Sequence, residues 1–460
     1  MNDRPYLTPT GCGPYRGDGP GFPVDLVPRL KHLEVGPEAL FLSWEVTRLA
    51  GRDIPTLKRR ALVLLVLALQ VASAGGSTRL PLSPGGQLDR ILEDLGATAD
   101  ERAAMEELLS ELQNGSVLPE LADLCGGPGE YRPLILDQGC LYMQKLHVLE
   151  ARTGALLRER ISGGSEGAAP GGGPAGEALD AAVEGALLDV FSHPPVTAFG
   201  KVELDEEQKR AVRTALSGRI AVISGRPGSG KTSIVASLLR VLARVERPPL
   251  EAVALAAPTG KAADRMRQSI ASHLAAIPDP GAADRRLAEA CPPALTLHRL
   301  LGYSPAADRF WHNENNPLAE QLIIVDESSM VDLAMMDRLL RALQPGARAV
   351  FLGDADQLPP VETGAVLRDL CRSGTAREKG RVVVLSKSYR ARAEDPAGKK
   401  ILDTAAAINE GRSLAEAGDL IAVRKEPAEL LFAGVEHLAV TSGEQAEAFF
   451  ARWRELILSG

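Results

Sequence analysis

Short runs of continuous apolar residues dominate the second half of the chain, and stretches with helical periodicity separate them. Five of these runs are bounded by Gly, Pro or Asp and rich in aliphatic residues: residues 219–225, 251–258, 321–327, 348–354 and 381–386. Continuous apolar strands that alternate with helices are typical of a parallel sheet buried on both faces. The sequence therefore predicts an α/β fold after about residue 196.

The first third of the chain has a different pattern, with apolar residues at i, i+3 and i+4 spacing. This spacing predicts a mostly helical N-terminal domain over residues 1–161, interrupted by a strand-like piece at residues 133–137. The apolar run at residues 61–69 predicts a buried helix, because a bilayer span needs about 20 residues. Residues 162–177 are rich in Gly, Ala, Ser and Pro, which predicts a flexible linker. A further helix is expected over residues 178–192.

The composition of the chain excludes some classes of protein. The chain has 460 residues, 45% of them hydrophobic, and a net charge of −8, which excludes both a wholly disordered chain and a globally basic nucleic-acid coat. A local basic groove remains compatible with this charge. Five cysteines without CxxC spacing indicate reduced thiols. Because no signal pattern or membrane span is apparent either, we expect a cytoplasmic protein.

The strongest chemical motif is Gly-Arg-Pro-Gly-Ser-Gly-Lys-Thr, which lies between the first apolar run and a helical stretch. This spacing and these flanks are those of a P-loop. Gly225, Gly228 and Gly230 allow a tight turn whose backbone N–H groups face a phosphate. Lys231 supplies charge to the β- and γ-phosphates, and the Thr232 hydroxyl ligates Mg²⁺. The sequence thus predicts ATP and Mg²⁺ as ligands.

Two more polar groups follow strands of the same predicted sheet. Asp326 and Glu327 end the third apolar run, and parallel strands deliver their carboxyl ends to the ligand crevice. We expect Asp326 to hold Mg²⁺ and Glu327 to orient and activate the attacking water. Gln357 lies in a proline-containing loop after the fourth run and is expected to sense the γ-phosphate.

Five segments resemble motifs of superfamily 1 DNA helicases: GRPGSGKT, APTGKAA, LTLHRLLGY, VDESSM and GDADQLPPVETGAVLRDL. The chain is most similar to the RecD family, the alpha subunits of exodeoxyribonuclease V, because FLSWEVTRLAG and RPLILDQGCLYMQKLHVLE resemble their N-terminal domain. The resemblance covers about residues 38–160 and 200–411. It implies a first RecA-like ATPase domain over residues 178–385 and the beginning of an incomplete second one over residues 386–460.

The resemblance also implies roles that spacing alone does not give. Gln208 matches the glutamine that reads adenine, whereas its local pattern favours an exposed helix residue. Thr259 and Lys261 match a segment that contacts the backbone of single-stranded DNA. His298 lies in another motif of the family and is either a DNA-side residue or a structural hydrogen-bonding group. Arg390 matches the arginine that reaches the γ-phosphate.

The function implied is an ATP-dependent motor that moves 5′ to 3′ on single-stranded DNA and acts at duplex ends. It would work in double-strand break repair and recombination within a RecBCD-like complex, with RecB-like and RecC-like subunits as partners. Any cutting would belong to a partner, because no nuclease carboxylate cluster is apparent. One alternative is a truncated or non-catalytic assembly subunit whose N-terminal helices dock on partners, since no further motif of the second domain follows Arg390. A free-standing RecD-like helicase is a weaker alternative, because no helix–hairpin–helix motif is visible.

Overall fold

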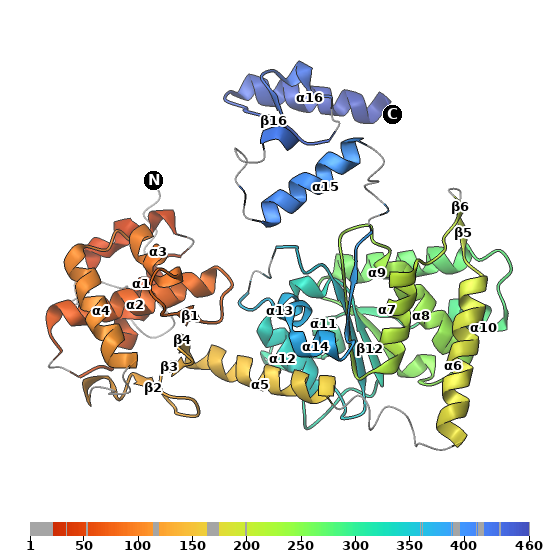
Figure 1. Ribbon diagram of the computed structural model, residues 1–460, viewed down its shortest axis with the longest axis horizontal. Coiled ribbons are helices and arrows are strands. Elements are labelled where there is room, and N and C mark those ends of the chain that lie inside the picture. The colour runs from red at the N-terminus through yellow and green to blue at the C-terminus, as the bar shows by residue number, and fades with distance from the viewer. Residues whose placement is uncertain are drawn as a thin grey trace.

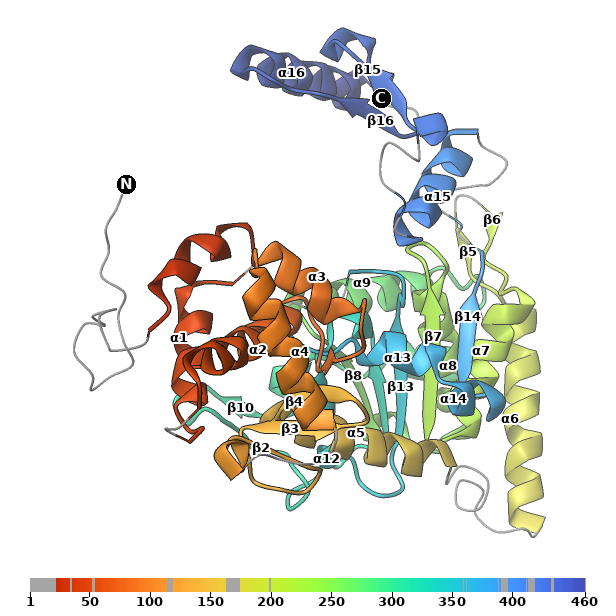
Figure 2. The ribbon, with the colours of Figure 1, turned by 60° about the vertical axis from the view of Figure 1, so that its left-hand side comes forward.

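The computed structural model contains an N-terminal unit, a central α/β domain and a C-terminal unit (Figures 1 and 2). It describes residues 22–33, 35–51, 54–113, 119–162, 174–197, 200–358, 360, 362–387, 389, 396–410, 412, 418–431 and 434–459. Among these residues, no helix is long and apolar enough to cross a membrane.

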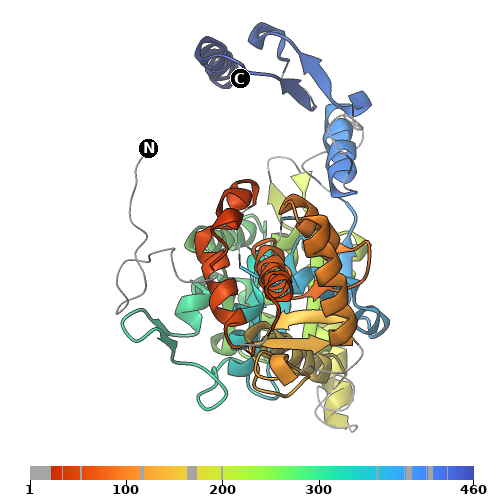
Figure 3. The same ribbon diagram turned by 90° about the vertical axis from the view of Figure 1, so that its left-hand side faces the viewer.

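The N-terminal unit is built around one apolar helix, and Figure 3 views the molecule from the side of this unit. Its helices are η1 (Val24–His32), α1 (Pro37–Thr47), α2 (Thr56–Ala74), α3 (Gln87–Asp94), α4 (Ala99–Gln113) and the short η2 (Pro119–Leu121). Helix α2 packs against α1, α3 and α4. All of residues 61–69 are buried. The predicted buried helix is therefore confirmed, and its apolar surface forms the centre of this unit's core.

A small sheet lies beside these helices, and the sequence predicted only one of its strands. Its order is β1 (Leu80–Pro81), β4 (Cys140–Met143), β3 (Leu134–Asp137) and β2 (Cys125–Gly126). Strand β3 is the predicted piece at residues 133–137. The others are two to four residues long, too short for a periodic pattern to reveal.

The central sheet has six parallel strands in the order β14-β7-β13-β12-β8-β9. Their bounds are β7 (Ile220–Gly225), β8 (Val253–Ala257), β9 (Ala294–Thr296), β12 (Leu322–Val325), β13 (Arg348–Gly353) and β14 (Val382–Leu385). The five predicted strands are thus confirmed, together with the α/β fold class. Strand β9 was missed because it is three residues long and only partly buried at the edge of the sheet.

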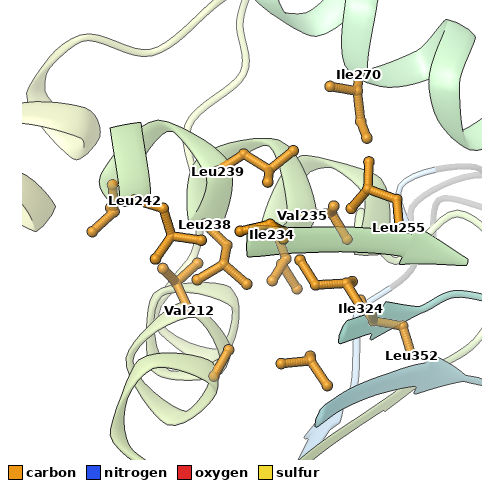
Figure 4. Close-up of a cluster of buried hydrophobic side chains, with 14 of the residues drawn as sticks. Val212, Ile234, Val235, Leu238, Leu239, Leu242, Leu255, Ile270, Ile324 and Leu352 are labelled. Atoms are coloured by element: carbon orange, nitrogen blue, oxygen red, sulfur yellow. The ribbon is translucent and has the colours of Figure 1, made fainter. Parts of the chain in front are cut away.

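Helices cover both faces of this sheet, as a RecA-like fold requires. One face carries α6 (Pro174–Ser192), α7 (Glu206–Ser217), α8 (Lys231–Val245), α9 (Gly260–Ala275) and α10 (Ala282–Glu289). The other carries α5 (Gln144–Ser162), α11 (Leu297–Leu300), α12 (Leu333–Ala342), α13 (Val366–Arg372) and α14 (Gly374–Glu378). Alternate strand residues enter the two cores: Ile323 belongs to the core that contains α12. Ile324 belongs to the core that contains α8, which Figure 4 shows.

Helices occupy both ends of the predicted linker, because α5 ends at Ser162 and α6 begins at Pro174. Residues 174–177 belong to the first turn of α6, so they are helical rather than linker, and the helix expected from residue 178 begins at Pro174. Residues 163–173 lie outside the described residues. The remaining domain boundaries stay predictions.

Short elements join these layers, and a small unit follows β14. The connecting elements are β5 (Val196–Thr197), β6 (Gly200–Lys201), η3 (Leu250–Ala252), the hairpin β10 (Tyr303–Ser304) and β11 (Arg309–Phe310), and η4 (Ser328–Met330). The C-terminal unit contains α15 (Pro396–Asn409), η5 (Gly418–Leu420), β15 (Ala422–Arg424), η6 (Pro427–Glu429), β16 (Glu436–Leu438) and α16 (Gly443–Ser459). Strands β15 and β16 pair in parallel. Its interpretation as the beginning of a second RecA-like domain stays a prediction.

Helix α5 follows the small sheet of the N-terminal unit and packs along α12 of the α/β domain. It therefore connects the two parts of the structure. Near its middle, Arg152 donates two hydrogen bonds of 2.6 Å to the buried carboxylate of Asp337. Near its end, the buried Arg160 guanidinium lies 3.3–3.5 Å from carbonyl oxygens at the end of α12, those of Leu340, Leu343, Gln344 and Ala347. A cation at the carboxyl end of a helix pairs with free carbonyls and with the negative end of the helix dipole.

Arg160→Ala is expected to destabilise the α/β domain. The substitution leaves buried carbonyl oxygens without their donor, so we expect a loss of about 2–3 kcal/mol in the free energy of unfolding. Urea denaturation followed by circular dichroism measures it. Arg158→Ala is the matched control, because Arg158 is exposed two residues earlier on the same helix. Equal midpoints for the two variants would contradict the assigned role of Arg160.

Candidate nucleotide-binding site

A cavity of about 660 Å³ opens at the carboxyl ends of β7, β8, β12 and β13. Most of the predicted site residues line it: Gly228, Gly230, Lys231, Thr232, Thr259, Lys261, Asp326, Glu327 and Gln357. These residues come from four separate βα connections. The parallel sheet brings them together because all of its strands end at the same edge.

The P-loop has the backbone that phosphate binding needs. Gly228 and Gly230 have φ values of 81° and 80°, in the left-handed region that favours glycine, and Gly230 is the N-cap of α8. A Cβ at Gly230 would collide with the Gln208 side chain. Lys231 Nζ donates to the carbonyl oxygens of Gly225, at 2.5 Å, and Arg226, at 3.4 Å. The ammonium group therefore already lies over the turn in which a phosphate would be held.

The acidic pair follows β12 directly. Glu327 has φ 51° and ψ 36°, a left-handed conformation that is costly for a side chain other than glycine, and its N–H donates to Asp326 Oδ1 at 2.9 Å. Burial raises the pKa of the Asp326 carboxyl, and the neighbouring charge of Glu327 adds to this effect. A bound cation would favour the charged form of the Asp326 carboxyl.

The donors present fit an Mg²⁺–nucleotide complex. Mg²⁺ usually takes one or two protein oxygens and completes its shell with phosphate and water. Thr232 and Asp326 are a hydroxyl and a carboxylate on the wall of one cavity, next to the P-loop turn. Within the described part of the chain, no group of three or more His, Cys, Asp or Glu side chains forms a metal site. The two oxygen donors of Thr232 and Asp326 suit a metal that arrives with phosphates.

Gln357 is tied to the acidic segment. Its Oε1 accepts a hydrogen bond from Ser329 Oγ at 3.3 Å, two residues after Glu327. Its backbone carbonyl accepts one from Arg368 Nη2 at 3.4 Å. The loop that carries Gln357 is thus held beside the residues that would contact the γ-phosphate.

Some predicted residues lie outside the cavity lining. Gln208 is 3% exposed: its Nε2 donates to Ser229 O at 2.9 Å, and its Oε1 accepts from the Asp205 N–H at 2.9 Å. It completes the capping box of α7 and contacts the P-loop from behind, so adenine recognition by Gln208 stays a prediction. Gly225 ends β7 and is likewise not part of the lining.

His298 also lies elsewhere. Its ring stacks edge-on against Tyr303 at 5.4 Å and lies 5.7 Å from Phe310, on the β10–β11 hairpin. Its expected role on the DNA side is not tested by this contact and stays a prediction. Arg390 lies outside the described residues.

Sequence reasoning missed residues that do line the cavity, chiefly Arg265 and Tyr389. Arg265 follows Lys261 by four residues on α9, so helical spacing was a signal that could have placed it on the same face. The Tyr389 N–H donates to Gly228 O at 2.9 Å, and its hydroxyl donates to Asp205 Oδ2 at 2.9 Å. Burial and the Asp205 carboxylate raise the pKa of Tyr389 to about 12. No local pattern indicated that this tyrosine returns to the P-loop.

The sheet order, the P-loop and the acidic pair define a RecA-like P-loop nucleotide-binding domain. Residues 208–363 match the family described as AAA domain. The RecBCD enzyme subunit RecD of Mycobacterium tuberculosis is 46% identical over 189 residues, which cover 40% of this chain and 32% of that protein. The same subunit of Haemophilus influenzae is 39% identical over 199 residues, 42% of this chain and 31% of that protein.

A further relative is the ATP-dependent RecD2 DNA helicase of Deinococcus radiodurans, 38% identical over 216 residues, 46% of this chain and 25% of that protein. The crystal structure of Pif1 helicase from Candida albicans is a distant match, with a TM-score of 0.32 and 22% identity over 47% of this chain and 46% of that one. The sequence matches span about a third of the RecD subunits and a quarter of the RecD2 helicase. The nucleotide-binding domain is thus similar in sequence to RecD subunits and to the RecD2 DNA helicase.

Proposed function

We propose that this chain supplies the ATP-hydrolysing domain of a 5′ to 3′ DNA helicase in a RecBCD-like complex. Its partners would be RecB-like and RecC-like subunits in the cytoplasm, and its substrate the end of a duplex in double-strand break repair and recombination. One observation carries the proposal: a single cavity joins the P-loop, the Asp326–Glu327 pair and Gln357. The similarity to RecD subunits supports the choice of substrate and partners.

Several residues of the cavity take part in the hydrolysis of ATP, and each has its own role. Lys231 and the N–H groups at the start of α8 hold the β- and γ-phosphates. Thr232 and Asp326 would hold Mg²⁺, which would neutralise charge on the phosphate oxygens. Glu327 accepts the proton of a water molecule whose oxygen bonds to the γ-phosphorus, while the bond from that phosphorus to the β–γ bridging oxygen breaks and leaves ADP. Gln357 contacts the γ-phosphate and reports its loss.

Helix α9 offers a route from nucleotide to DNA. The Thr259 side chain caps the helix by accepting from the Ala262 N–H at 3.2 Å, and both Thr259 and Lys261 are exposed. The same helix presents Arg265 to the cavity. A phosphate of single-stranded DNA bound at the first turn would therefore touch the element that walls the nucleotide site.

The proposal is tested by ATP hydrolysis of the 460-residue chain with and without single-stranded DNA. We expect DNA to raise turnover. In Lys261→Ala, several-fold more DNA should be needed for half-maximal stimulation, and the slope of log affinity against log salt should fall by about 1, because one phosphate contact is lost. The KM for ATP should stay unchanged. Arg267→Ala is the control, because Arg267 lies on the same helix but pairs with Asp264 at the surface.

Other results contradict parts of the proposal. A changed KM for ATP with unchanged DNA affinity would assign Lys261 to the nucleotide instead of DNA. Nucleotide binding without any turnover would favour the second candidate, a non-catalytic assembly subunit. That candidate is supported by large apolar side chains exposed on the N-terminal unit: Val24, Leu42, Leu49 and Leu57.

A further inference from the structure

The end of α2 contacts the loop that carries Gln357, across the seam between the N-terminal unit and the α/β domain. The hydroxyls of Ser73 and Thr363 lie 3.1 Å apart, and Thr363 Oγ1 also donates to the Ser73 carbonyl at 3.3 Å. The Gly364 N–H donates to Gly76 O at 3.1 Å. The partners are nearly 290 residues apart in sequence, so only the docking of the two units brings them together.

The same loop is held on its other side by the α/β domain. The Leu333 N–H donates to Thr363 O at 3.2 Å, and Gly364 has φ 102°, with so little space that a Cβ would lie 2.6 Å from Leu333 Cβ. At the near end of the loop, Arg368 donates to the Gln357 carbonyl. Thr363 and Gly364 are therefore held from both sides, and one of the two sides is the N-terminal unit.

The seam around these contacts is open. A cavity of about 540 Å³ separates the two units there, and its wall includes Gly76 and Gly364 as well as the side chains of Arg79, Glu150 and Arg368. A few hydrogen bonds at the edge of a cavity hold less rigidly than a packed core would. The position of the loop therefore depends on the position of the N-terminal unit relative to the α/β domain.

We propose that Ser73 and Thr363 are positioning residues for Gln357, through which the N-terminal unit sets the rate of ATP hydrolysis. This inference rests on the proposed function and adds a means of regulating the same site. Ser73 acts on the reaction only through Thr363 and the loop, and touches no nucleotide. A shift of about 1 Å in a group that positions the reacting atoms can cost on the order of 100-fold in rate. Loss of one hydroxyl contact should therefore show in turnover.

Thr363→Val tests the tie, because valine has the shape of threonine without its hydroxyl. At saturating single-stranded DNA, we expect kcat for ATP to fall five- to tenfold, roughly the weight of one neutral hydrogen bond, with KM within twofold of the starting value. Thr363→Ser should restore at least half of the lost kcat. Ser73→Ala should lower kcat by less, because the hydrogen bond from Thr363 Oγ1 to the Ser73 carbonyl remains, and the double variant should be no slower than Thr363→Val alone.

Thr56→Ala is the matched control, since Thr56 lies exposed at the opposite end of α2. It should leave kcat unchanged. If Thr56→Ala lowered kcat as much as Ser73→Ala does, the effect would be a general one on folding and the proposal would be overturned. Additive losses in the double variant would overturn it for the same reason. Unchanged turnover in Thr363→Val would overturn it as well.

Hydrogen–deuterium exchange of the full chain without nucleotide tests the seam independently of turnover. Ser73→Ala should speed exchange several-fold in peptides that cover residues 354–366, and Thr56→Ala should not. If the unsubstituted chain hydrolyses no ATP, the proposed function fails, and the exchange result alone decides on the seam. Faster exchange confined to this loop supports the tie, whereas unaltered exchange refutes it.

Discussion

Lys231→Ala is expected to lower kcat for ATP hydrolysis by about 10²–10³-fold, because it removes a preorganised cation from the phosphates on which charge develops. ATP affinity should fall too, since the ammonium group also binds the phosphates of the ground state, although less strongly than those of the transition state. Lys231 Nζ donates to the Gly225 and Arg226 carbonyls, so it lies next to the P-loop turn that would hold a phosphate. Turnover is measured by phosphate release at saturating DNA, and affinity by a fluorescent ATP analogue.

Lys379→Ala provides the matched control. Lys379 is exposed just after α14, ahead of β14 and thus at the edge of the sheet opposite the cavity. This variant should keep full turnover, and both variants should unfold at the same temperature within a few degrees. Retention of more than a tenth of the turnover in Lys231→Ala would rule out the assigned chemistry of the P-loop.

The sheet and the phosphate end of the site were predictable because their signals are local. Five of the six central strands lie in continuous apolar runs, and burial on both faces favours such runs. The P-loop is encoded in eight consecutive residues whose glycines and lysine each have one physical task. Asp326 and Glu327 follow a strand directly, so the strand prediction also located them.

The rest depended on contacts between distant segments. The local sequence around Gln208 is the same whether the side chain completes a capping box or reads a base. Only the packing of α7 against the P-loop shows that its Oε1 and its Nε2 both form hydrogen bonds within the protein. Tyr389 reaches Gly228 through the arrangement of β14 beside β7. Ser73 and Thr363 meet because two units dock. No local sequence pattern predicts a contact between segments so far apart in the chain.

Glu327→Gln is expected to separate binding from chemistry. Glutamine keeps the size of the side chain and the backbone cost of the left-handed conformation, but its amide takes up no proton from water at neutral pH. General-base catalysis contributes about 10²–10⁴-fold, so we expect kcat to fall by about 10²–10³-fold. Lys231, Thr232 and Asp326 remain, so affinity for the ATP analogue with Mg²⁺ should stay within threefold. Lys231→Ala would lose both properties.

Glu320→Gln is the control for this substitution, because Glu320 precedes the same strand, β12, at the edge of the sheet away from the cavity. It should leave kcat and affinity unchanged. If Glu327→Gln kept turnover near that of the unsubstituted chain while Asp326→Asn abolished it, Asp326 would be the base and Glu327 would only shape the turn. If Glu327→Gln lost nucleotide affinity as well, Glu327 would belong to the binding of Mg²⁺. Slow turnover with intact nucleotide binding is the one result that identifies Glu327 as the group that accepts the proton of the attacking water. Glu327 is also the residue whose backbone has a left-handed conformation directly after β12.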